Sequence, residues 1–467
     1  MTTTTTTAPA RLNAEWLKVS AIILTTFVVC WTIVVWYWNT TEHNPGTRDL
    51  VLALVILPAG LLLAFWGGRK VLAARVALPA ASASKPASSA PANASMTAPV
   101  LAIVATALRS PHGASADELA SAIADNDARA DLDKELVDDN GFPVMTARTD
   151  NALHEALQDE IAEWLSGQGM RLHLSDEQWR ALILATNVAG ELASLASGNL
   201  MPAEGKPPLL QLKLLLPQDW SVELQRAATM WLKHTVSQYG WPEASIAVPD
   251  ATAQDMHTTP AATLSQLMST PSTHSAPTVA IVIACASLIG QESIDRLAAN
   301  SSLFTSSQSR GQIPGEGAAG LLLTDLQQAQ ACGSGFALLG PVDERRRDTS
   351  ADDTKRVDAT MLLDMAEQAC KASAIDASQV AMVVADTVHR PNRVLELMGL
   401  GAPALPQVDA ADDIVRIGLG LGSCGAVPFI TALALAQHYA LERGAPVFCI
   451  GNEDPFLRSV TLVRPPA

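Results

Sequence analysis

Two long apolar runs near the start of the chain constrain its architecture more than any other feature. The first, residues 19–38, has 20 residues without a charge, and the second, residues 50–66, has 17. A helix of about 20 apolar residues crosses the roughly 30 Å hydrocarbon core of a bilayer. The two runs therefore predict a transmembrane helical hairpin over residues 19–66. A signal peptide is the alternative for the first run, but its apolar core is too long and no small-residue cleavage site precedes Asn39.

Basic residues indicate the orientation of this hairpin. Arg11 and Lys18 precede the first run, and Arg69, Lys70 and Arg75 follow the second. Because cytoplasmic flanks carry the excess of Lys and Arg, both termini are expected in the cytoplasm. The sequence thus predicts a cytoplasmic tail (residues 1–18), the transmembrane hairpin (19–66), an Ala/Ser/Pro-rich linker (67–99) and a large domain (100–467).

Beyond the linker, short apolar strands alternate with amphipathic segments of helix length. Strands are expected at residues 100–108, 209–217, 278–287 and 380–388, which predicts an α/β layered fold with a mainly parallel sheet. The run VAMVVADTV (380–388) mirrors VLAIVATAL (100–108), and PVFCIGNED (446–454) mirrors the strand around Ile281. This indicates two related halves, about 100–340 and 357–467.

The segment between these halves, residues 342–356, is dense in charges. We expect it to be a solvated loop, and a partner-binding segment is the alternative.

Composition restricts the partners and cofactors of the chain. The excess of 47 Asp and Glu over 31 Lys and Arg gives a formal net charge of −16, which repels phosphate backbones and makes a nucleic-acid partner unfavourable. The six cysteines are widely spaced without a CxxC, as expected in a reducing compartment. The nine histidines form no HxH or HExxH motif, so no metal ion and no cofactor is expected.

The motif IPGEGAAGLLL, residues 313–323, places Glu316 in a glycine turn at the mouth of a buried strand. The carboxylate either takes part in chemistry at the strand end or accepts backbone N–H groups as a structural clasp. We favour the clasp, because buried charges persist mainly where hydrogen bonds satisfy them.

The motif GLGSCG, residues 420–425, satisfies GxGxxG between an apolar strand and a helix, as a dinucleotide-binding turn does. That fingerprint normally opens a domain, however, and Glu453, the next acid after a strand, lies too far downstream. Cys424 could be a nucleophile activated by the helix N-terminus, with His389 as a distant partner. A small buried residue is the alternative for Cys424.

Residues 284–326, which include the GEGA turn, resemble the core of β-ketoacyl synthases of the thiolase-like superfamily. Residues 418–465 are similar to their closing glycine-rich turn, helix and hairpin. The resemblance implies a duplicated, layered α-β-α-β-α fold, a homodimer formed through a sheet edge, and a Glu316 that clasps its own turn.

The departures from that family bear on activity. The position of the nucleophilic cysteine falls in residues 240–266, which contain none. Gly422 stands where the last catalytic histidine is expected, and ADTVHRPNR (385–393) lacks the HGTGT signature of the other. Condensation then has no mechanism. We therefore expect no catalytic, no cofactor-binding and no metal-ligating residue.

The whole layout, with LLLPQDW (214–220) and GWPEASI (240–246), resembles the lipase-adaptor proteins of type VI secretion. The resemblance implies a non-catalytic adaptor at the bacterial inner membrane, with its large domain in the cytoplasm. Such an adaptor binds a phospholipase-type effector and loads it on the secretion spike protein. The alternatives are a membrane-tethered ketosynthase-like acyltransferase whose nucleophile has moved to Cys424 or Cys285, and a membrane-bound scaffold without cargo.

Overall fold

The computed structural model describes residues 100–150, 152–202, 206–248, 258–269, 277–333, 335–353 and 357–466, which belong to one compact unit, Ser95–Ala467. The expected tail, transmembrane hairpin and linker lie outside the described residues. Among the described residues, one helix, Asp176–Leu200, is long and apolar enough to cross a membrane, and 67% of its most apolar window is buried inside the protein. Burial to this degree is what a core helix requires.

Thirteen strands are described. They are β1 (Leu101–Arg109), β2 (Asp131–Val137), β3 (Pro143–Thr146), β4 (Leu210–Leu215), β5 (Ile246–Ala247), β6 (Val279–Ser287), β7 (Glu316–Thr324), β8 (Ala337–Leu339), β9 (Asp343–Arg346), β10 (Met382–Ala385), β11 (Ile414–Arg416), β12 (Val447–Gly451) and β13 (Leu457–Arg464).

The described helices are α4 (Ala116–Ala124), α5 (Glu155–Gly167), α6 (Asp176–Leu200), α7 (Val222–Gln238), α8 (Pro260–Ser269), α9 (Gln291–Ala299), α10 (Leu326–Cys332), α11 (Thr360–Ser373), α12 (Pro391–Met398), α13 (Gly401–Ala404), α14 (Gly418–Leu421) and α15 (Val427–Arg443). Short 3₁₀ turns occur at Glu243–Ser245 and Ala377–Gln379.

The large sheet consists of two repeats with the same topology. Its order is β11-β10-β12-β13-β8-β1-β7-β6-β4-β5, and β9 pairs with β13 outside this path. In each repeat, with its five strands numbered along the chain, the spatial order is 3-2-4-5-1, the pairs 2-3 and 2-4 are parallel, and the pairs 4-5 and 5-1 are antiparallel. Antiparallel pairing of β1 with β8 joins the repeats. The duplicated architecture expected from the sequence is therefore present.

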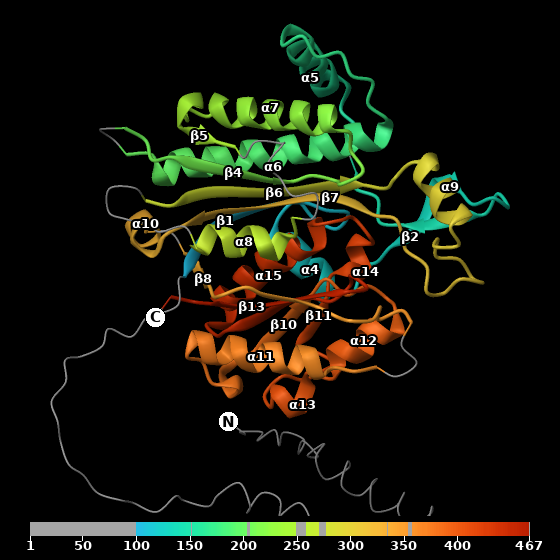
Figure 1. Ribbon diagram of the computed structural model, residues 1–467, viewed down its shortest axis with the longest axis vertical. Helices are drawn as coiled ribbons and strands as arrows, with labels where there is room; N and C mark the ends of the chain where they lie inside the picture. Colours follow the sequence, from blue (N-terminus) through green and yellow to red (C-terminus); the bar gives the residue numbers. More distant parts are fainter. Residues whose placement is uncertain are drawn as a thin grey trace, which may run out of the picture. The chain divides into compact units, whose positions relative to one another are not determined.

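Helices and half-sheets alternate in five layers (Figure 1). The helices α6 and α7 cover the first half-sheet, α8 and α15 lie between the two half-sheets, and α11 and α12 cover the second. The strand β6 shows how the sequence encodes this order. Its Ile281 and Ile283 enter the outer core below α6, whereas Val282 and Ala284 enter the central core. A strand buried on both faces reads as a continuous apolar run, which is why residues 279–287 are apolar almost throughout.

The helix α6 begins at a complete capping box. The Ser175 hydroxyl accepts the Gln178 N–H, and the Gln178 side chain accepts the Ser175 N–H. Two backbone donors at the helix start are thereby satisfied, so the helix start is fixed by sequence.

Three expectations need correction. The sheet is mixed rather than mainly parallel. The run around Met382 forms β10, the second strand of its repeat, and its counterpart is β4 rather than β1. The first residues of the charged segment after Val342 are not a solvated loop, because they form β9 and pair with β13, whereas Asp348 and Thr349 beyond them are exposed loop residues. Charges at the start of this segment are accommodated by partners: Arg346 lies over the Phe456 ring, 4.9 Å from the ring centroid, and Arg347 is paired with Glu396.

Candidate functional site

Glu316 is a structural residue in a fully satisfied site. Its buried carboxylate accepts hydrogen bonds from Arg180 (Nε to Oε2, 2.7 Å; Nη2 to Oε1, 2.5 Å), the Thr149 N–H (2.7 Å) and the Ser287 hydroxyl (2.9 Å). The prediction that hydrogen bonds hold the Glu316 carboxylate in a structural role is confirmed, but the predicted donors, the backbone N–H groups of its own turn, are wrong. Glu316 does not bind its own turn; it ties the start of β7 to α6 and to the end of β6.

The glycine-rich turn at residues 420–425 packs against the GEGA turn through backbone contacts. Gly422 has φ +61°, and a Cβ there would lie 2.7 Å from the Ile313 carbonyl oxygen. Ser423 donates its N–H to that oxygen (2.7 Å), and Gly315 donates its N–H to the Ser423 carbonyl (3.2 Å). Close packing of the two turns therefore explains why glycine is required at position 422, without a bound dinucleotide.

The cysteines considered as relocated nucleophiles are buried. Cys424 lies in the turn before α15, its Sγ is 3.5 Å from the Leu421 carbonyl oxygen, and burial raises the pKa of its thiol far above the usual range. Burial also raises the pKa of the Cys285 thiol, on β6, to about 12. Because the thiolate is the nucleophilic form, neither residue has the properties of an activated nucleophile.

The helix α8 occupies the place where the ketosynthase resemblance puts a nucleophile at a helix start. Residues 249–257 before it lie outside the described part. Thr259 caps the helix by accepting the Ala262 N–H (3.0 Å), and its hydroxyl donates to Glu344 (2.9 Å). This hydroxyl is thus engaged in a structural contact.

A more informative site lies where β10 and β12 end side by side. These strands are parallel neighbours, and the chain leaves them in opposite directions, from β10 toward β11 and from β12 toward β13. In α/β sheets, ligands bind beyond the carboxyl ends of strands at such a switch point. The residues that follow the two strands here are Asp386 and Thr387, and Asn452 and Glu453.

Hydrogen bonds connect the two strand ends. Asp386 Oδ1 accepts the N–H groups of Asn452 (2.8 Å) and Glu453 (3.1 Å). In return, Glu453 Oε2 accepts the Val388 N–H (3.0 Å), and the Thr387 hydroxyl donates to Asn452 Oδ1. The two carboxyl groups are therefore held beside one another by backbone donors.

Burial raises the pKa of both carboxyl groups at this site. Burial, reinforced by the charge of Glu453, raises the pKa of Asp386 to about 7, against the hydrogen bonds that it accepts. The Asp386 side chain is closely surrounded by protein but is only partly buried, so solvent can reach it. Burial likewise raises the pKa of Glu453, against the Val388 N–H and the charges of Arg390 and Arg393. Asp386 can therefore bind or release a proton near neutral pH.

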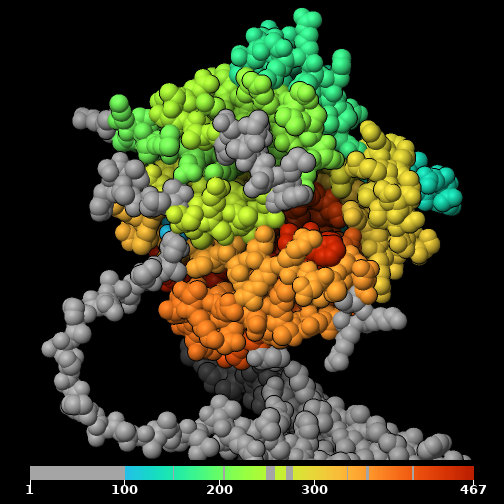
Figure 2. All heavy atoms as spheres, viewed as in Figure 1, coloured from blue at the N-terminus to red at the C-terminus, as the bar shows by residue number. Residues whose placement is uncertain are grey.

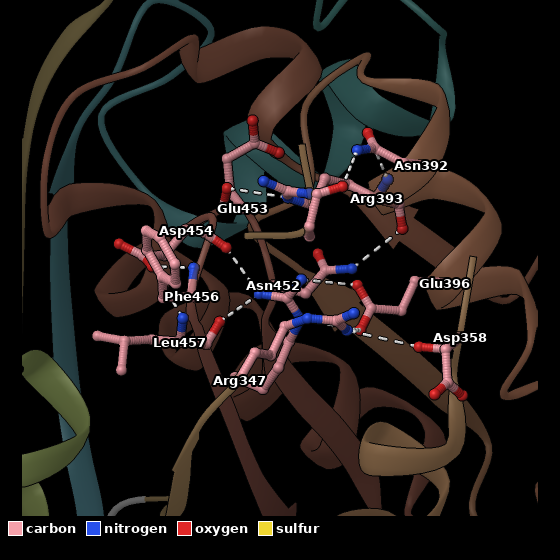
Figure 3. A network of polar contacts seen from close by, with 12 residues as sticks. Arg347, Asp358, Asn392, Arg393, Glu396, Asn452, Glu453, Asp454, Phe456 and Leu457 are labelled. Carbon is pink, nitrogen blue, oxygen red and sulfur yellow. Dashed lines mark hydrogen bonds and ion pairs between the residues drawn. The ribbon is translucent and has the colours of Figure 1, made fainter. Parts of the chain in front are cut away.

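A network of buried arginines supports the site (Figure 3). Arg393, from α12, donates from Nε to the Glu453 carbonyl (3.2 Å) and from Nη2 to Asp352 (3.0 Å). One turn further along α12, Glu396 accepts two hydrogen bonds from Arg458 (2.9 and 2.8 Å) and one from Arg347 (2.8 Å). Paired buried charges of this kind specify one arrangement of α12 against the sheet.

His389 lies at the rim of this site. It is half-buried against Phe304 in an edge-to-face contact, with ring centroids 4.8 Å apart, and its ring also lies beside the backbone of Ser309 and Gly311. Burial and the charge of Arg390 lower its pKa. Cys424 belongs to the turn before α15, and the structure shows no contact between it and His389.

Sequence reasoning identified part of this site. The sequence pointed to Glu453 only as an acid too far downstream for a dinucleotide-binding motif, and it did not point to Asp386 or Arg393. The available signal was the pair of apolar runs that each end in a polar residue, VVAD and CIGNE, because parallel neighbours bring such ends together. No group of three or more His, Cys, Asp or Glu suited to a metal ion occurs in the described part of the chain.

Comparison with known proteins concerns the fold. No protein-family model and no curated protein matches the sequence. Among solved structures, the chain is similar to the ketosynthase from module 6 of the bacillaene synthase from Bacillus subtilis 168, with TM-score 0.53, 11% identity, and coverage of 79% of this chain and 72% of that chain. It is similar to the ketosynthase from module 1 of the bacillaene synthase from Bacillus amyloliquefaciens FZB42, with TM-score 0.52, 10% identity, and coverage of 80% and 74%.

A third similar structure is a type II polyketide synthase acyl-carrier protein in complex with its ketosynthase, with TM-score 0.52, 13% identity, and coverage of 78% of this chain and 98% of that chain. Identities this low establish a fold and no activity. The described part of the chain has the thiolase-like fold of ketosynthases.

Proposed function

We propose that this protein is a non-catalytic adaptor that uses a ketosynthase-like domain to bind a secreted, phospholipase-type effector and to load it on the spike protein of a type VI secretion machine. It would do so at the bacterial inner membrane, anchored by the hairpin at residues 19–66, with the domain in the cytoplasm. A tether of this kind raises the local concentration of the domain at the membrane without any new contact.

The proposal that the protein is non-catalytic rests on the burial of its described cysteines. The five described cysteines, Cys285, Cys332, Cys370, Cys424 and Cys449, all have thiol pKa values raised by burial. A condensing enzyme of this fold needs a thiolate, and burial disfavours that form. Binding a partner needs only a stable surface, which the layered fold supplies.

The adaptor part rests on the sequence resemblance and is tested by deletion. Deleting the gene should abolish delivery of one effector while the secretion machine and other effectors continue to work. Affinity purification of the full chain after mild detergent extraction should recover the same effector. Continued delivery of every effector, or loss of all secretion, would contradict the adaptor role, and the second result would favour the scaffold.

The homodimer implied by the family remains a prediction. Light scattering of a protein that begins near Thr97 should give twice the monomer mass, and a monomer across micromolar concentrations would refute it.

A further inference from the structure

The hairpin formed by β2 and β3 exposes large apolar side chains. At the right of Figure 1 it extends past α9, and in Figure 2 its teal atoms project beyond the yellow α9 region. Phe142 is 67% exposed, Leu132 58% and Val137 37%. Three large apolar side chains are thus exposed within one short hairpin, and a partner that covers the hairpin would bury them.

The exposure does not arise from a loosely held segment, because the base of the hairpin is fixed. Asp133 is buried and accepts two hydrogen bonds from Arg148 (2.9 and 2.8 Å) and one from the Thr146 hydroxyl (2.7 Å). Leu136 and Val144 are buried in a small apolar core with residues of α9. The sheet-like ribbon is therefore anchored through its inner face, and its outer side chains are held in the open.

The tip is fixed as well. The Asp138 N–H donates to the Phe142 carbonyl (2.9 Å), the Phe142 N–H donates to Asp138 Oδ1 (2.9 Å), and Gly141 supplies the left-handed turn residue with φ +78°. Phe142 therefore sits at a preorganised position, and a partner that covers it does not have to order this backbone. Aromatic side chains in such positions are typical anchors of protein interfaces.

The charge around these apolar residues identifies the partner's chemistry. Asp131, Glu135 and Asp139 are exposed on the hairpin, where Glu135 is also paired with Arg148 (3.3 Å), and Lys134 is its exposed base. A second copy of this chain would bring the same acids together, and an anionic membrane surface would also be repelled. A basic, amphipathic segment complements both the carboxylates and the apolar side chains.

We propose that the β2–β3 hairpin, residues 131–146, is the docking surface for a basic amphipathic segment of the partner protein. This inference rests on the proposed function, because it assumes that the domain acts by binding a partner protein. It adds where the cargo docks and what chemistry the docking segment has: lysine or arginine on one face, and leucine-like side chains that cover Phe142 and Leu132.

The test uses the full chain in a nonionic detergent and three synthetic helical peptides of the same length. One combines Lys with Leu, the second has Gln in place of Lys, and the third has Glu. Only the Lys/Leu peptide should bind, with an affinity that weakens as salt is added. Substituting Leu132→Ser together with Phe142→Ser should weaken binding at least tenfold.

Two matched controls separate this surface from general attraction to an acidic protein. Leu395→Ser removes a leucine that is also 58% exposed, on α12, and should leave affinity unchanged. The triple change Asp131→Asn, Glu135→Gln and Asp139→Asn should weaken binding. The triple change Asp159→Asn, Glu160→Gln and Glu163→Gln removes as many exposed acids from α5 and should not.

Several outcomes would overturn the proposal: no binding of the Lys/Leu peptide, equal losses in the hairpin and α5 triple variants, or self-association of the wild type that the hairpin changes abolish. If an effector co-purifies equally with the wild type and the Leu132→Ser/Phe142→Ser variant, this docking surface is wrong while the adaptor role stands. If no effector co-purifies with the wild type, the adaptor role itself fails. Circular dichroism confirms that each variant is folded.

Discussion

Arg180 and Glu316 form a buried ion pair that has a counterpart of opposite polarity in the second repeat. In the first repeat the glutamate begins β7 and the arginine lies on the covering helix α6. In the second, Arg458 lies near the start of β13, the corresponding strand, and Glu396 lies on the covering helix α12. Both repeats thus join their fifth strand to an outer helix by a charge pair with the charges exchanged, although α6 precedes the second strand of its repeat and α12 follows it.

Breaking the first pair should be costly. Arg180→Met leaves the Glu316 carboxylate buried without its countercharge, which is expected to lower the free energy of unfolding by about 3–5 kcal/mol. The double variant Arg180→Met/Glu316→Leu should recover part of this loss, because it leaves no unpaired charge. Urea unfolding followed by circular dichroism measures both. Glu191→Gln, which breaks the partly exposed pair with Arg109, should cost less than about 1 kcal/mol; equal losses in the two single variants would contradict the assignment.

The glycine turn before α15 should tolerate no side chain at Gly422. A Cβ there meets the Ile313 carbonyl, and its backbone (φ +61°, ψ −158°) lies in a region open essentially to glycine alone. Gly444 (φ +61°, ψ 28°) is left-handed helical and has open space around it. Gly444→Ala should cost about 1–2 kcal/mol from the left-handed backbone alone. Gly422→Ala should cost roughly 1–3 kcal/mol more, because its backbone conformation is more strained for alanine and because the neighbouring turn has to shift. Equal unfolding free energies for the two variants would show that the contact between the turns is not tight.

Asp386 should make stability depend on pH in a defined direction. Its folded pKa of about 7 exceeds its unfolded value, so the stability that it contributes is present at low pH and is lost as pH rises through about 4 to about 7. Asp386→Asn stays neutral and should remove this loss. A pKa raised from 3.8 to about 7 corresponds to about 4 kcal/mol, so relative to wild type the variant should gain up to about 4 kcal/mol between about pH 4 and about pH 8. A wild type and a variant with parallel pH profiles would show that Asp386 is not perturbed.

Sequence reasoning succeeded where burial decides the pattern and failed where partners come from distant parts of the chain. The strands around Ile281 and Phe448 were found because both faces of each strand are buried. Residues 342–356 were predicted to be a solvated loop because of their charges, but Arg347, directly after β9, is paired with Glu396 from far along the chain. Asp386 was missed for the same reason: its hydrogen-bond donors lie on β12, which only the fold places next to β10.

The thiols should be inert in the folded protein. A small maleimide should leave Cys285, Cys424 and Cys449 unmodified at neutral pH, since burial raises the pKa of each. The same residues should react readily in urea. Stoichiometric labelling of Cys424 or Cys285 in the folded chain by a thiol-reactive acyl analogue would instead support the relocated-nucleophile enzyme.

The central claim is that this ketosynthase-like chain acts by binding and not by acyl chemistry. It is tested most directly by measuring effector delivery in a deletion strain complemented with the variant Cys285→Ala/Cys424→Ala. If the protein is an adaptor, delivery equals that of the wild type at equal protein abundance. Loss of delivery by a variant that is folded, abundant and still bound to the effector would contradict the account and show that a thiol reaction is required.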